Sequence, residues 1–501
     1  MKKRMQLLGL SLILVQLLFS ISAIAQEKRE FRGAWIQCVN GQFQGMSTQT
    51  MQQTLISQLD VLQRDGVNAI IFQVRPECDA LYASKLEPWS RFLTGQQGRA
   101  PQPYWDPLEW MINQCHRRGM ELHAWINPYR ALTKGTKEIA STHIAVRQPQ
   151  NCFEYDGLTI LNPGIPANRD YICQVARDIV TRYDIDGIHM DDYFYPYPAA
   201  GQTIPDAAQF RQFGSHFSNI GDWRRNNVNL FIEQFYKTVH DAKPWVKVGI
   251  SPFGIYRNKK SSAKGSDTNG LQNYDDLYAD VLLWVDKGWL DYCVPQIYWE
   301  IGNRAADYKT LINWWANNAA KRHLYIGEDV ERTVKNSDPQ HPSQHQQEAK
   351  YLLNQQLKPA VKGTVLWYAK AVVDNVGSYG DQLRTRYWRT PTLQPTMSYI
   401  SKTAPRRVRK LKAVWTSDGY MLFWTAPRGT GWKREARQYV VYRFAKGEKV
   451  NTDDASHIVA VTPNNYYKLP YDFGKEKFTY VVTALDRLHN ESSTRKRTVK
   501  L

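Results

Sequence analysis

The 501-residue chain lacks several features that mark common protein classes. Its six cysteines include no CxxC pair, which argues against a structural zinc site and against a redox motif. Cys38, Cys78 and Cys293 lie in or beside apolar, strand-like runs, where small buried side chains are expected. Beyond residue 25, no 18 apolar residues follow one another without interruption, so we expect no membrane-spanning segment.

Acidic residues are scarce relative to basic ones. The chain has 47 Asp and Glu against 65 Lys and Arg, a formal net charge of +18. Such a balance favours an anionic partner, namely an acidic glycan, a membrane surface or nucleic acid. Solvated protein faces also carry charge runs, so charge alone does not select the partner. Part of the excess lies near the C-terminal end, in Arg406, Arg407, Arg409, Lys410, Lys412, Arg495, Lys496, Arg497 and Lys500.

Residues 1–25 have the pattern of a cleaved signal peptide. Lys2, Lys3 and Arg4 precede a short apolar run, and Ala23-Ile24-Ala25 is an A-x-A cleavage site. We therefore expect a periplasmic or secreted protein, which disfavours nucleic acid as the partner. No cysteine follows the cleavage site directly, so a lipid anchor is not expected. The sequence indicates no oligomeric state.

From about residue 30 to 390, short β-rich apolar runs alternate with helical-period segments. This rhythm predicts an α/β fold with a parallel sheet, and eight strands predict a closed (β/α)8 TIM barrel. The span exceeds the usual ~250 residues of that fold, so long loops are expected at 84–106, 131–166, 194–222 and 257–275. The expected strands are Phe31–Val39, Ala69–Arg75, Glu121–Ile126, Gly187–Asp192, Val246–Ser251, Tyr292–Tyr298, His323–Ile326 and Thr364–Trp367. The expected helices include Thr50–Arg64, Pro107–Arg118, Arg169–Tyr183, Trp223–Ala242, Leu277–Lys287, Ala305–Lys321 and Pro342–Leu357.

The pattern of apolar and turn residues changes after residue 390. The proline-rich segment 391–405 is typical of a linker. From 406 to 501, short alternating runs separated by turn residues predict a small all-β sandwich. Two of these runs, Tyr439–Arg443 and Tyr480–Asp486, resemble strands of fibronectin type III modules. The runs expected as strands are Leu411–Trp415, Gly419–Trp424, Gln438–Phe444, His457–Val461 and Phe478–Leu485.

Polar and aromatic side chains gather where the barrel strands end. Active sites of parallel barrels form at these carboxyl ends, so these residues are candidates for binding a substrate. The aromatic content of 13%, with 17 Trp and 29 Tyr, suits either sugar-stacking platforms or large cores. The candidates are Arg75, His123, Asn127, Tyr129, His189, Tyr193, Tyr195, Gln296, Tyr298, Trp299, Trp367 and Tyr368.

Acid groups at two strand ends are the candidates for catalysis. Side chains alternate along a strand, so His189 and Asp191 share the inward face while Asp192 points elsewhere or begins the loop. Glycoside hydrolysis needs one ionised and one protonated carboxyl group. We expect Asp191, or else Asp192, to be the ionised group. We expect Glu300 to be the protonated group, the general acid, because it follows two aromatic residues and desolvation there would raise its pKa as an acid requires.

Other interpretations of the same residues stay open. Strand-end aspartates often only cap helices. Arg75 is also suited to an ion pair with Glu77 or Asp79, His123 to a barrel core, and Trp367 with Tyr368 to plugging the barrel. A metal-dependent hydrolase or deacetylase would use His123, His189, Asp191 and Asp192, although no HxH or HExxH spacing is present. A glycan-binding barrel without catalysis is a further alternative, and no cofactor is indicated.

Eight motifs occur in an order that resembles a known family. They are Phe31–Trp35, Phe72–Pro76, His123–Arg130, Asp186–Asp192, Tyr193–Pro196, Asp222–Val228, Ser251–Gly254 and Pro295–Trp299. Together they resemble the glycosyl-hydrolase-like ten family of bacterial envelope proteins over about residues 29–340. Fibronectin-like C-terminal modules also occur in that family.

The resemblance implies a TIM barrel over 29–390 that hydrolyses an envelope glycan. A branch of the family cleaves peptidoglycan strands that have lost their stem peptides. Each bared lactyl group is a carboxylate, which would suit a basic protein. That branch is lipid-anchored and this chain has no lipidation cysteine, so its location and substrate can differ. The C-terminal module is expected to pack on the barrel or to engage the wall.

Overall fold

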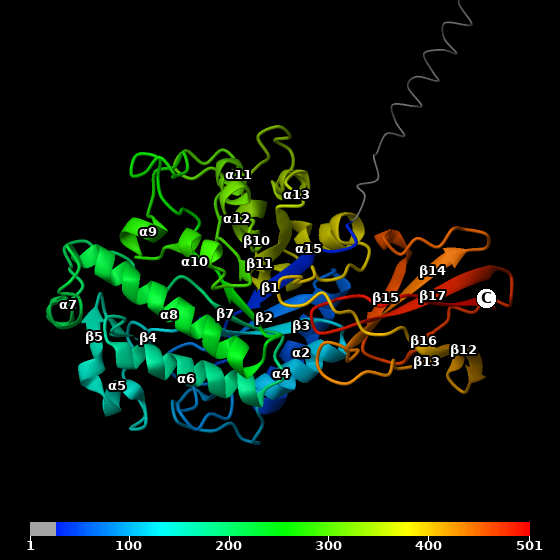
Figure 1. The fold of residues 1–501 in the computed structure, drawn as a ribbon, viewed down its shortest axis with the longest axis horizontal. Coiled ribbons are helices and arrows are strands. Elements are labelled where there is room, and N and C mark those ends of the chain that lie inside the picture. The colour runs from blue at the N-terminus through cyan, green and yellow to red at the C-terminus, as the bar shows by residue number, and fades with distance from the viewer. Residues whose placement is uncertain (1–26) are drawn as a thin grey trace, which may run out of the picture.

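A computed structural model describes residues 27–501, and eight parallel strands in it close into a barrel (Figure 1). The expected signal peptide lies outside the described residues. Going round the barrel, the order is β1-β11-β10-β9-β8-β7-β3-β2, so the strands follow the chain and the predicted (β/α)8 barrel is confirmed. The barrel strands are β1 (Phe31–Ile36), β2 (Ala69–Arg75), β3 (Glu121–Ile126), β7 (Gly187–Met190), β8 (Lys247–Ile250), β9 (Tyr292–Cys293), β10 (His323–Asp329) and β11 (Val361–Trp367).

Large rings fill the barrel interior, and glycines on neighbouring strands make room for them. The rings of Phe31 and Tyr325 stack with centroids 4.1 Å apart, and Tyr292 lies beside both. A Cβ atom on Gly249 would lie 1.9 Å from the Tyr292 ring, and one on Gly187 would lie 2.5 Å from the His123 ring. The strand glycines therefore allow a packed interior, with a cavity only above it.

Helices surround the barrel at the predicted places (Figure 1). Their starts follow local capping chemistry, since the side chains of Ser47 and Asp106 accept backbone N–H groups at the first turns of α2 and α4. The long helices are α2 (Thr48–Arg64), α4 (Pro107–Arg117), α6 (Pro166–Arg182), α8 (Ile220–Ala242), α11 (Tyr308–Asn318) and α13 (Gln347–Gln356). The short ones are α3 (Arg91–Thr94), α5 (Ile144–Arg147), α7 (Ala207–Phe213), α9 (Asn273–Asp276), α10 (Val281–Lys287), α12 (Val330–Lys335), α14 (Ala369–Val373) and α15 (Tyr379–Gln382).

The insertion after β3 contains a sheet that the sequence did not predict. The segment expected as a loop over 131–166 forms three antiparallel strands in the order β4-β6-β5. Each strand is only three or four residues long, too short to show a clear alternation. The strands are β4 (Arg130–Leu132), β5 (Cys152–Tyr155) and β6 (Leu158–Leu161).

Two antiparallel sheets follow at the C-terminal end, at the right of Figure 1. Their orders are β12-β13-β16 and β15-β14-β17-β18. All five expected strands are present, and β16 and β18 add to them, while the fibronectin type III resemblance stays a prediction. The strands are β12 (Arg409–Thr416), β13 (Gly419–Thr425), β14 (Gln438–Ala445), β15 (Ile458–Thr462), β16 (Tyr466–Lys468), β17 (Lys477–Leu485) and β18 (Arg495–Lys500).

A loop of this C-terminal module closes the amino end of the barrel. Leu488 is fully buried and packs in the same cluster as Phe31 and Tyr292 of the barrel interior. The neighbouring His489 ring lies 2.7 Å from a carboxylate oxygen of Glu121 at the start of β3. The predicted packing of the module on the barrel is confirmed by these contacts.

All six cysteines are free thiols, and Cys38, Cys78 and Cys293 are buried, as expected of small core side chains. Within residues 27–501, no helix has the length and apolar character that crossing a bilayer requires.

Candidate active site

A cavity of about 310 Å³ opens at the carboxyl ends of the barrel strands. This volume lies at the lower end of small-molecule sites and suits a unit about the size of one sugar residue. Three tryptophans and two tyrosines form much of its wall, around the carboxyl group of Asp191. The lining residues are Trp35, Val39, Gln73, Trp125, Arg130, Asp191, Tyr193, Ser251, Gln296, Tyr298 and Trp367.

Asp191 is the acidic side chain that lines this cavity. It follows β7, is buried, and accepts hydrogen bonds from the Asn127 amide at 3.2 and 3.1 Å. Burial raises the pKa of Asp191 to about 6, although Arg130 and the Asn127 amide favour the charged form. Asn127, expected to bind substrate, therefore holds the carboxylate in place.

Asp192 lies beside the cavity wall and is almost completely buried. The hydroxyl group of Tyr197 donates a hydrogen bond to it. Burial and the neighbouring charge of Asp191 raise the pKa of Asp192 to about 7, against the effect of Tyr197 and Gln296. The structure thus holds two adjacent acids with raised pKa values, the property that sequence reasoning had assigned to Glu300.

Glu300 does not have the environment expected of a general acid. It is not among the residues that line the cavity, and its carboxylate accepts a hydrogen bond from the Asn303 amide at 2.7 Å. Burial is slight, and this hydrogen bond with the charges of Arg332 and Lys350 holds the pKa of Glu300 below its ordinary value. The expectation of a raised pKa was wrong, because the aromatic residues Tyr298 and Trp299 do not enclose its carboxyl group.

Five of the residues expected to bind substrate or act in catalysis meet at the cavity: Asp191, Tyr193, Gln296, Tyr298 and Trp367. Two others, Arg75 and Tyr129, lie away from it because their side chains are packed elsewhere in the protein. Arg75 is fully buried in a bidentate ion pair with Glu87, a partner other than the one weighed from sequence. Tyr129 packs against Phe231.

The remaining substrate-binding candidates do not line the cavity. Tyr195 packs against Tyr278, and Trp299 against Phe253. The hydroxyl group of Tyr368 donates to Glu331. None of these three side chains lines the cavity.

His123 and His189 lie in the barrel interior below the cavity. A ring nitrogen of each lies within 3.1 Å of the Tyr292 hydroxyl group, and Trp35 donates its indole N–H to His189. Burial and His123 hold the pKa of His189 well below its ordinary value, which favours a neutral ring. Within residues 27–501, no three His, Cys, Asp or Glu side chains are grouped as metal ligands, so the set required by the metal interpretation does not come together.

Several cavity residues were not among the expected binding residues. They include Trp35, Gln73, and Arg130, which the sequence places among the polar residues after the third strand. Side chains alternate along a strand, and Trp35 and Gln73 each lie two or four positions from another residue on the inward face of their strand. This alternation alone could have identified both as cavity residues. Arg130 begins the unpredicted strand β4, and its guanidinium lies 5.1 Å from the centre of the Tyr193 ring.

Two of these residues carry donors that the protein leaves free. The Gln73 carbonyl oxygen accepts the backbone N–H groups of Cys38 and Val39, which fixes the orientation of its amide. Its buried Nε2 then has no hydrogen-bond partner within the described residues. In Arg130, only Nε donates, to the carbonyl oxygen of Pro76 at 3.2 Å. The cavity therefore presents unpaired N–H groups, which suits a ligand with oxygen acceptors.

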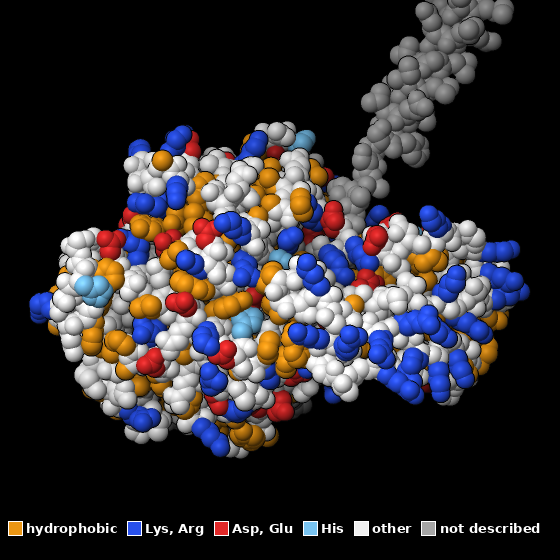
Figure 2. Space-filling model, in the orientation of Figure 1, with side chains coloured by type: hydrophobic (Ala, Val, Ile, Leu, Met, Phe, Trp, Pro, Cys, Tyr) orange, Lys and Arg blue, Asp and Glu red, His pale blue; other side chains and the backbone are white. Residues whose placement is uncertain are grey.

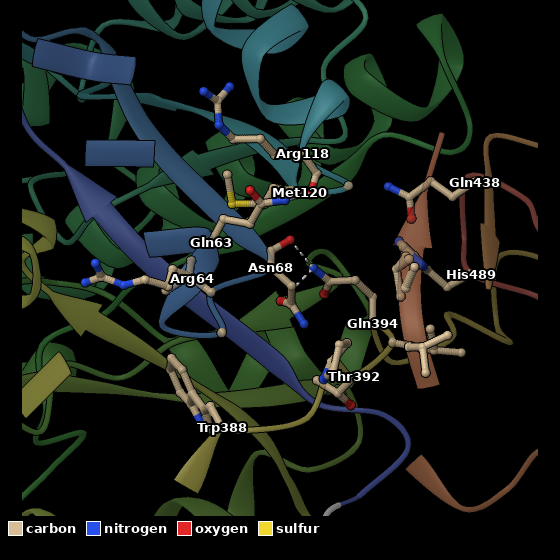
Figure 3. A pocket seen from close by; sticks show the side chains of 18 of the residues that line it. Gln63, Arg64, Asn68, Arg118, Met120, Trp388, Thr392, Gln394, Gln438 and His489 are labelled. Atoms are coloured by element: carbon tan, nitrogen blue, oxygen red, sulfur yellow. Dashed lines mark hydrogen bonds between the residues drawn. The ribbon is translucent and has the colours of Figure 1, made fainter. Parts of the chain in front are cut away.

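A second hollow lies at the opposite end of the barrel (Figure 3). It encloses about 330 Å³ between the amino ends of β2 and β3, the segment around Thr392, and the C-terminal module. Gln394 donates to the backbone and side-chain oxygens of Asn68 there, which ties this segment to the barrel. The amino face of such barrels commonly serves stability, and we regard this hollow as part of the module interface.

A closed barrel of eight parallel strands with its cavity at their carboxyl ends defines a (β/α)8 protein with a site in the usual position. The family model described as glycosyl hydrolase-like 10 matches residues 30–344. The chain belongs to this family, and the predicted span of 29–340 is confirmed.

Similar proteins extend the match beyond the barrel. A protein named glycosyl hydrolase YngK from Bacillus subtilis is 41% identical over 488 residues, 95% of each chain. Glycosyl hydrolase DigH from Escherichia coli is 38% identical over 327 residues, covering 60% of this chain and 73% of its own. Among solved structures, the PgaB (BpsB) glycoside hydrolase domain from Bordetella bronchiseptica aligns with a TM-score of 0.47 at 10% identity, over 72% of this chain and 99% of its own.

Proposed function

We propose that the protein is an exported glycoside hydrolase that cleaves peptidoglycan strands lacking stem peptides. The observation that carries the proposal is the aromatic cavity lined by Asp191 and by Arg130 with its free donors, together with Asp192 buried beside the cavity wall. Flat aromatic walls suit the faces of sugar rings. Arg130 suits the lactyl carboxylate that each muramic acid residue exposes once its peptide is removed. The signal-like residues 1–25 support export to the compartment where this polymer occurs.

In this proposal Asp192 is the general acid and Asp191 the ionised partner. The two groups follow one another on the end of β7, and β11, four strands away round the ring, presents Trp367 on the opposite wall. The two acids therefore share one side of the cavity and do not flank a bond from two sides. Some glycosidases solve this geometry with the 2-acetamido oxygen of the substrate as nucleophile.

Both sugars of peptidoglycan carry an acetamido group, so we extend the proposal to this mechanism. The acetamido oxygen attacks the anomeric carbon, the glycosidic C–O bond breaks, and Asp192 gives its proton to the leaving oxygen. The Asp191 carboxylate accepts the N–H of the cationic ring that forms. Water then attacks the anomeric carbon and loses a proton to Asp192, which restores the acetamido group with net retention of configuration.

Digestion of purified glycan strands tests the substrate and the bond cleaved. We expect new reducing ends, formed with retention in proton NMR spectra, from amidase-treated strands and few from strands that keep their peptides. Arg130→Ala should raise KM for these strands about tenfold, and less for strands whose carboxyl groups are reduced. The matched control Arg304→Ala removes an exposed arginine outside the cavity and should change neither value.

Binding of the strands without any cleavage would contradict the hydrolase and favour a glycan-binding barrel. Inversion of configuration, or loss of activity in Asp329→Asn equal to that in Asp191→Asn, would contradict the acetamido mechanism alone. Asp329 is the last residue of β10, and its carboxylate accepts the backbone N–H of Arg332 at the start of α12. Because this role is a cap, we expect Asp329→Asn to change the activity only slightly.

A further inference from the structure

The C-terminal module exposes a cluster of aromatic rings at one end of its three-stranded sheet. Trp415 is 58% exposed, Tyr471 44% and Phe473 85%. Trp415 stacks on Tyr420 across the strand pair β12 and β13, with centroids 4.9 Å apart, and Tyr471 meets it edge-on at 4.7 Å. The contacts hold the rings in place although water reaches them, so the surface is preformed.

A second aromatic row crosses the opposite face of the same sheet, because side chains alternate along each strand. Phe423 on β13 pairs in register with Lys412 on β12 and with Tyr466 on β16. Phe423 and Tyr466 are both exposed, and their ring centroids lie 6.1 Å apart. We call the first cluster, Trp415, Tyr420, Tyr471 and Phe473, the module surface. Large exposed apolar groups that cluster in this way mark interaction sites.

Unpaired cations are frequent on the module that carries this surface. Residues 406–501 contain 20 Lys and Arg against 9 Asp and Glu, and Figure 2 shows basic side chains crowding this lobe. Strand β12 packs against β18, which brings their charges together. Among the described residues, none of the following exposed cations forms an ion pair: Lys410, Lys412, Lys468, Arg495, Lys496, Arg497 and Lys500.

This combination selects one kind of partner by its chemistry. Flat rings suit the C–H faces of sugars, and unpaired Lys and Arg suit repeated negative charges along a chain. A glycan strand whose lactyl carboxylates are bare offers both at once. An uncharged apolar partner would leave the cations without a counter-charge.

We propose that the module surface is a second glycan-binding site, which holds an anionic strand of denuded peptidoglycan outside the cavity. The module packs at the amino end of the barrel, through His489 and Glu121, whereas the cavity lies at the carboxyl end. The module surface therefore tethers the protein to polymer and does not position the bond that is cut. The choice of glycan rests on the proposed function, while the binding itself does not.

Co-sedimentation with insoluble denuded glycan tests this proposal. The full chain carrying Asp192→Asn, to prevent digestion, is compared with the same chain carrying Trp415→Ala and Phe473→Ala. We expect the two substitutions to weaken retention at least tenfold, and Lys496→Glu with Arg497→Glu to weaken it most at low salt. Tyr104→Ala is the matched control, because Tyr104 is 62% exposed on the barrel. In the active chain, Trp415→Ala with Phe473→Ala should leave the hydrolysis of soluble short oligosaccharides unchanged.

Three outcomes would overturn the proposal. They are equal retention of the aromatic double variant, capture of vesicles of anionic phospholipid but not of glycan, and a dimer of the wild type that the double variant loses. Retention that depends on Trp415 and Phe473, in a wild type that cleaves no glycan, would support the module surface and reject the proposed hydrolase.

Discussion

At Asp191 and Asp192, burial and mutual repulsion decide which carboxyl group keeps its proton. The pKa values of about 6 and about 7 belong to a coupled pair, so a proton shared by the two is expected to reside mainly on Asp192 near neutral pH. Tyr197 and Asn127 each touch one member of the pair and bias this distribution. The chemistry proposed above requires this arrangement, with one charged and one protonated group.

The pair predicts a bell-shaped dependence of kcat/KM on pH. Activity should fall below about pH 6, where Asp191 becomes protonated, and above about pH 7, where Asp192 loses its proton. Tyr197→Phe removes a hydrogen bond that favours the Asp192 carboxylate, so it should raise that pKa and move the alkaline limb to higher pH. Initial rates from pH 4 to 9 measure this, with Tyr104→Phe as control. An alkaline limb that stays in place or moves down would contradict the assignment of Asp192.

The same pKa values predict that the site destabilises the fold. A carboxyl group with a pKa of about 3.9 in the unfolded chain and about 7 in the folded one makes the folded state less stable as pH rises through that window. Asp192→Asn should therefore increase the free energy of unfolding by about 1–3 kcal/mol at pH 8, and by less toward pH 4. Urea unfolding at both pH values measures the difference. A variant that is less stable than wild type at pH 8 would show that Asp192 is held by compensating contacts.

At the residue scale, sequence predicted what alternation along a strand can determine. It placed Asp191 on the inward face beside the site, and the structure brings it to the cavity. It could not predict the environment of Glu300, because the position of Asn303 and the charges of Arg332 and Lys350 depend on how loops fold together. For the same reason it could not assign a role to Arg130, a polar residue expected after the third strand, because that role follows from a sheet that forms within an insertion.

At the element scale, the end of β2 is joined to the following loop by a buried ion pair. Arg75 donates to both oxygens of Glu87 and to the carbonyl oxygens of Asn127 and Pro128, and neither charge is exposed. This set fixes the loop after β2 and the start of the loop after β3, and the latter leads to Arg130 in the cavity wall. Arg75, which was predicted from the sequence to bind substrate, therefore stabilises the loops instead.

Breaking this pair should be costly. Arg75→Met leaves Glu87 buried without a counter-charge, and we expect a loss of about 3–5 kcal/mol in the free energy of unfolding. Lys237→Met, which breaks an exposed pair with Asp241 on α8, is the control and should leave stability nearly unchanged. Equal effects of the two substitutions would contradict a structural role for Arg75.

Strand positions were predictable for a physical reason, and insertions were not. Runs such as Ala69–Phe72 are apolar on both faces because helices cover a parallel sheet outside and rings fill it inside. The three-residue strand Arg130–Leu132 has no such pattern, since short strands at the rim are stabilised by their neighbours.

At the scale of the whole molecule, the C-terminal module completes the base of the barrel. Glu121 is buried there and contacts three cationic or polar partners, Lys247, His123 and His489, of which the last comes from the module. Leu488 adds apolar contact with the barrel interior. The two parts are therefore expected to unfold together.

Substituting His489 tests this coupling. His489→Ala removes one partner of a buried carboxylate, and we expect a loss of about 1–3 kcal/mol with a single unfolding transition at lower temperature. His341→Ala, on an exposed loop, is the control. Calorimetry that resolves two transitions in the wild type would show instead that the module and the barrel unfold independently.

The measurement that tests the account most directly compares hydrolysis of denuded glycan strands by two carboxyl-to-amide variants. Asp192→Asn should lower kcat about 10³-fold, because it removes the proton donor, while Glu300→Gln should change kcat less than about threefold. Reducing-end release at pH 6.5, at matched protein concentration and verified folding, gives both values. A large loss in Glu300→Gln with near-normal activity in Asp192→Asn would contradict the active site described for this barrel.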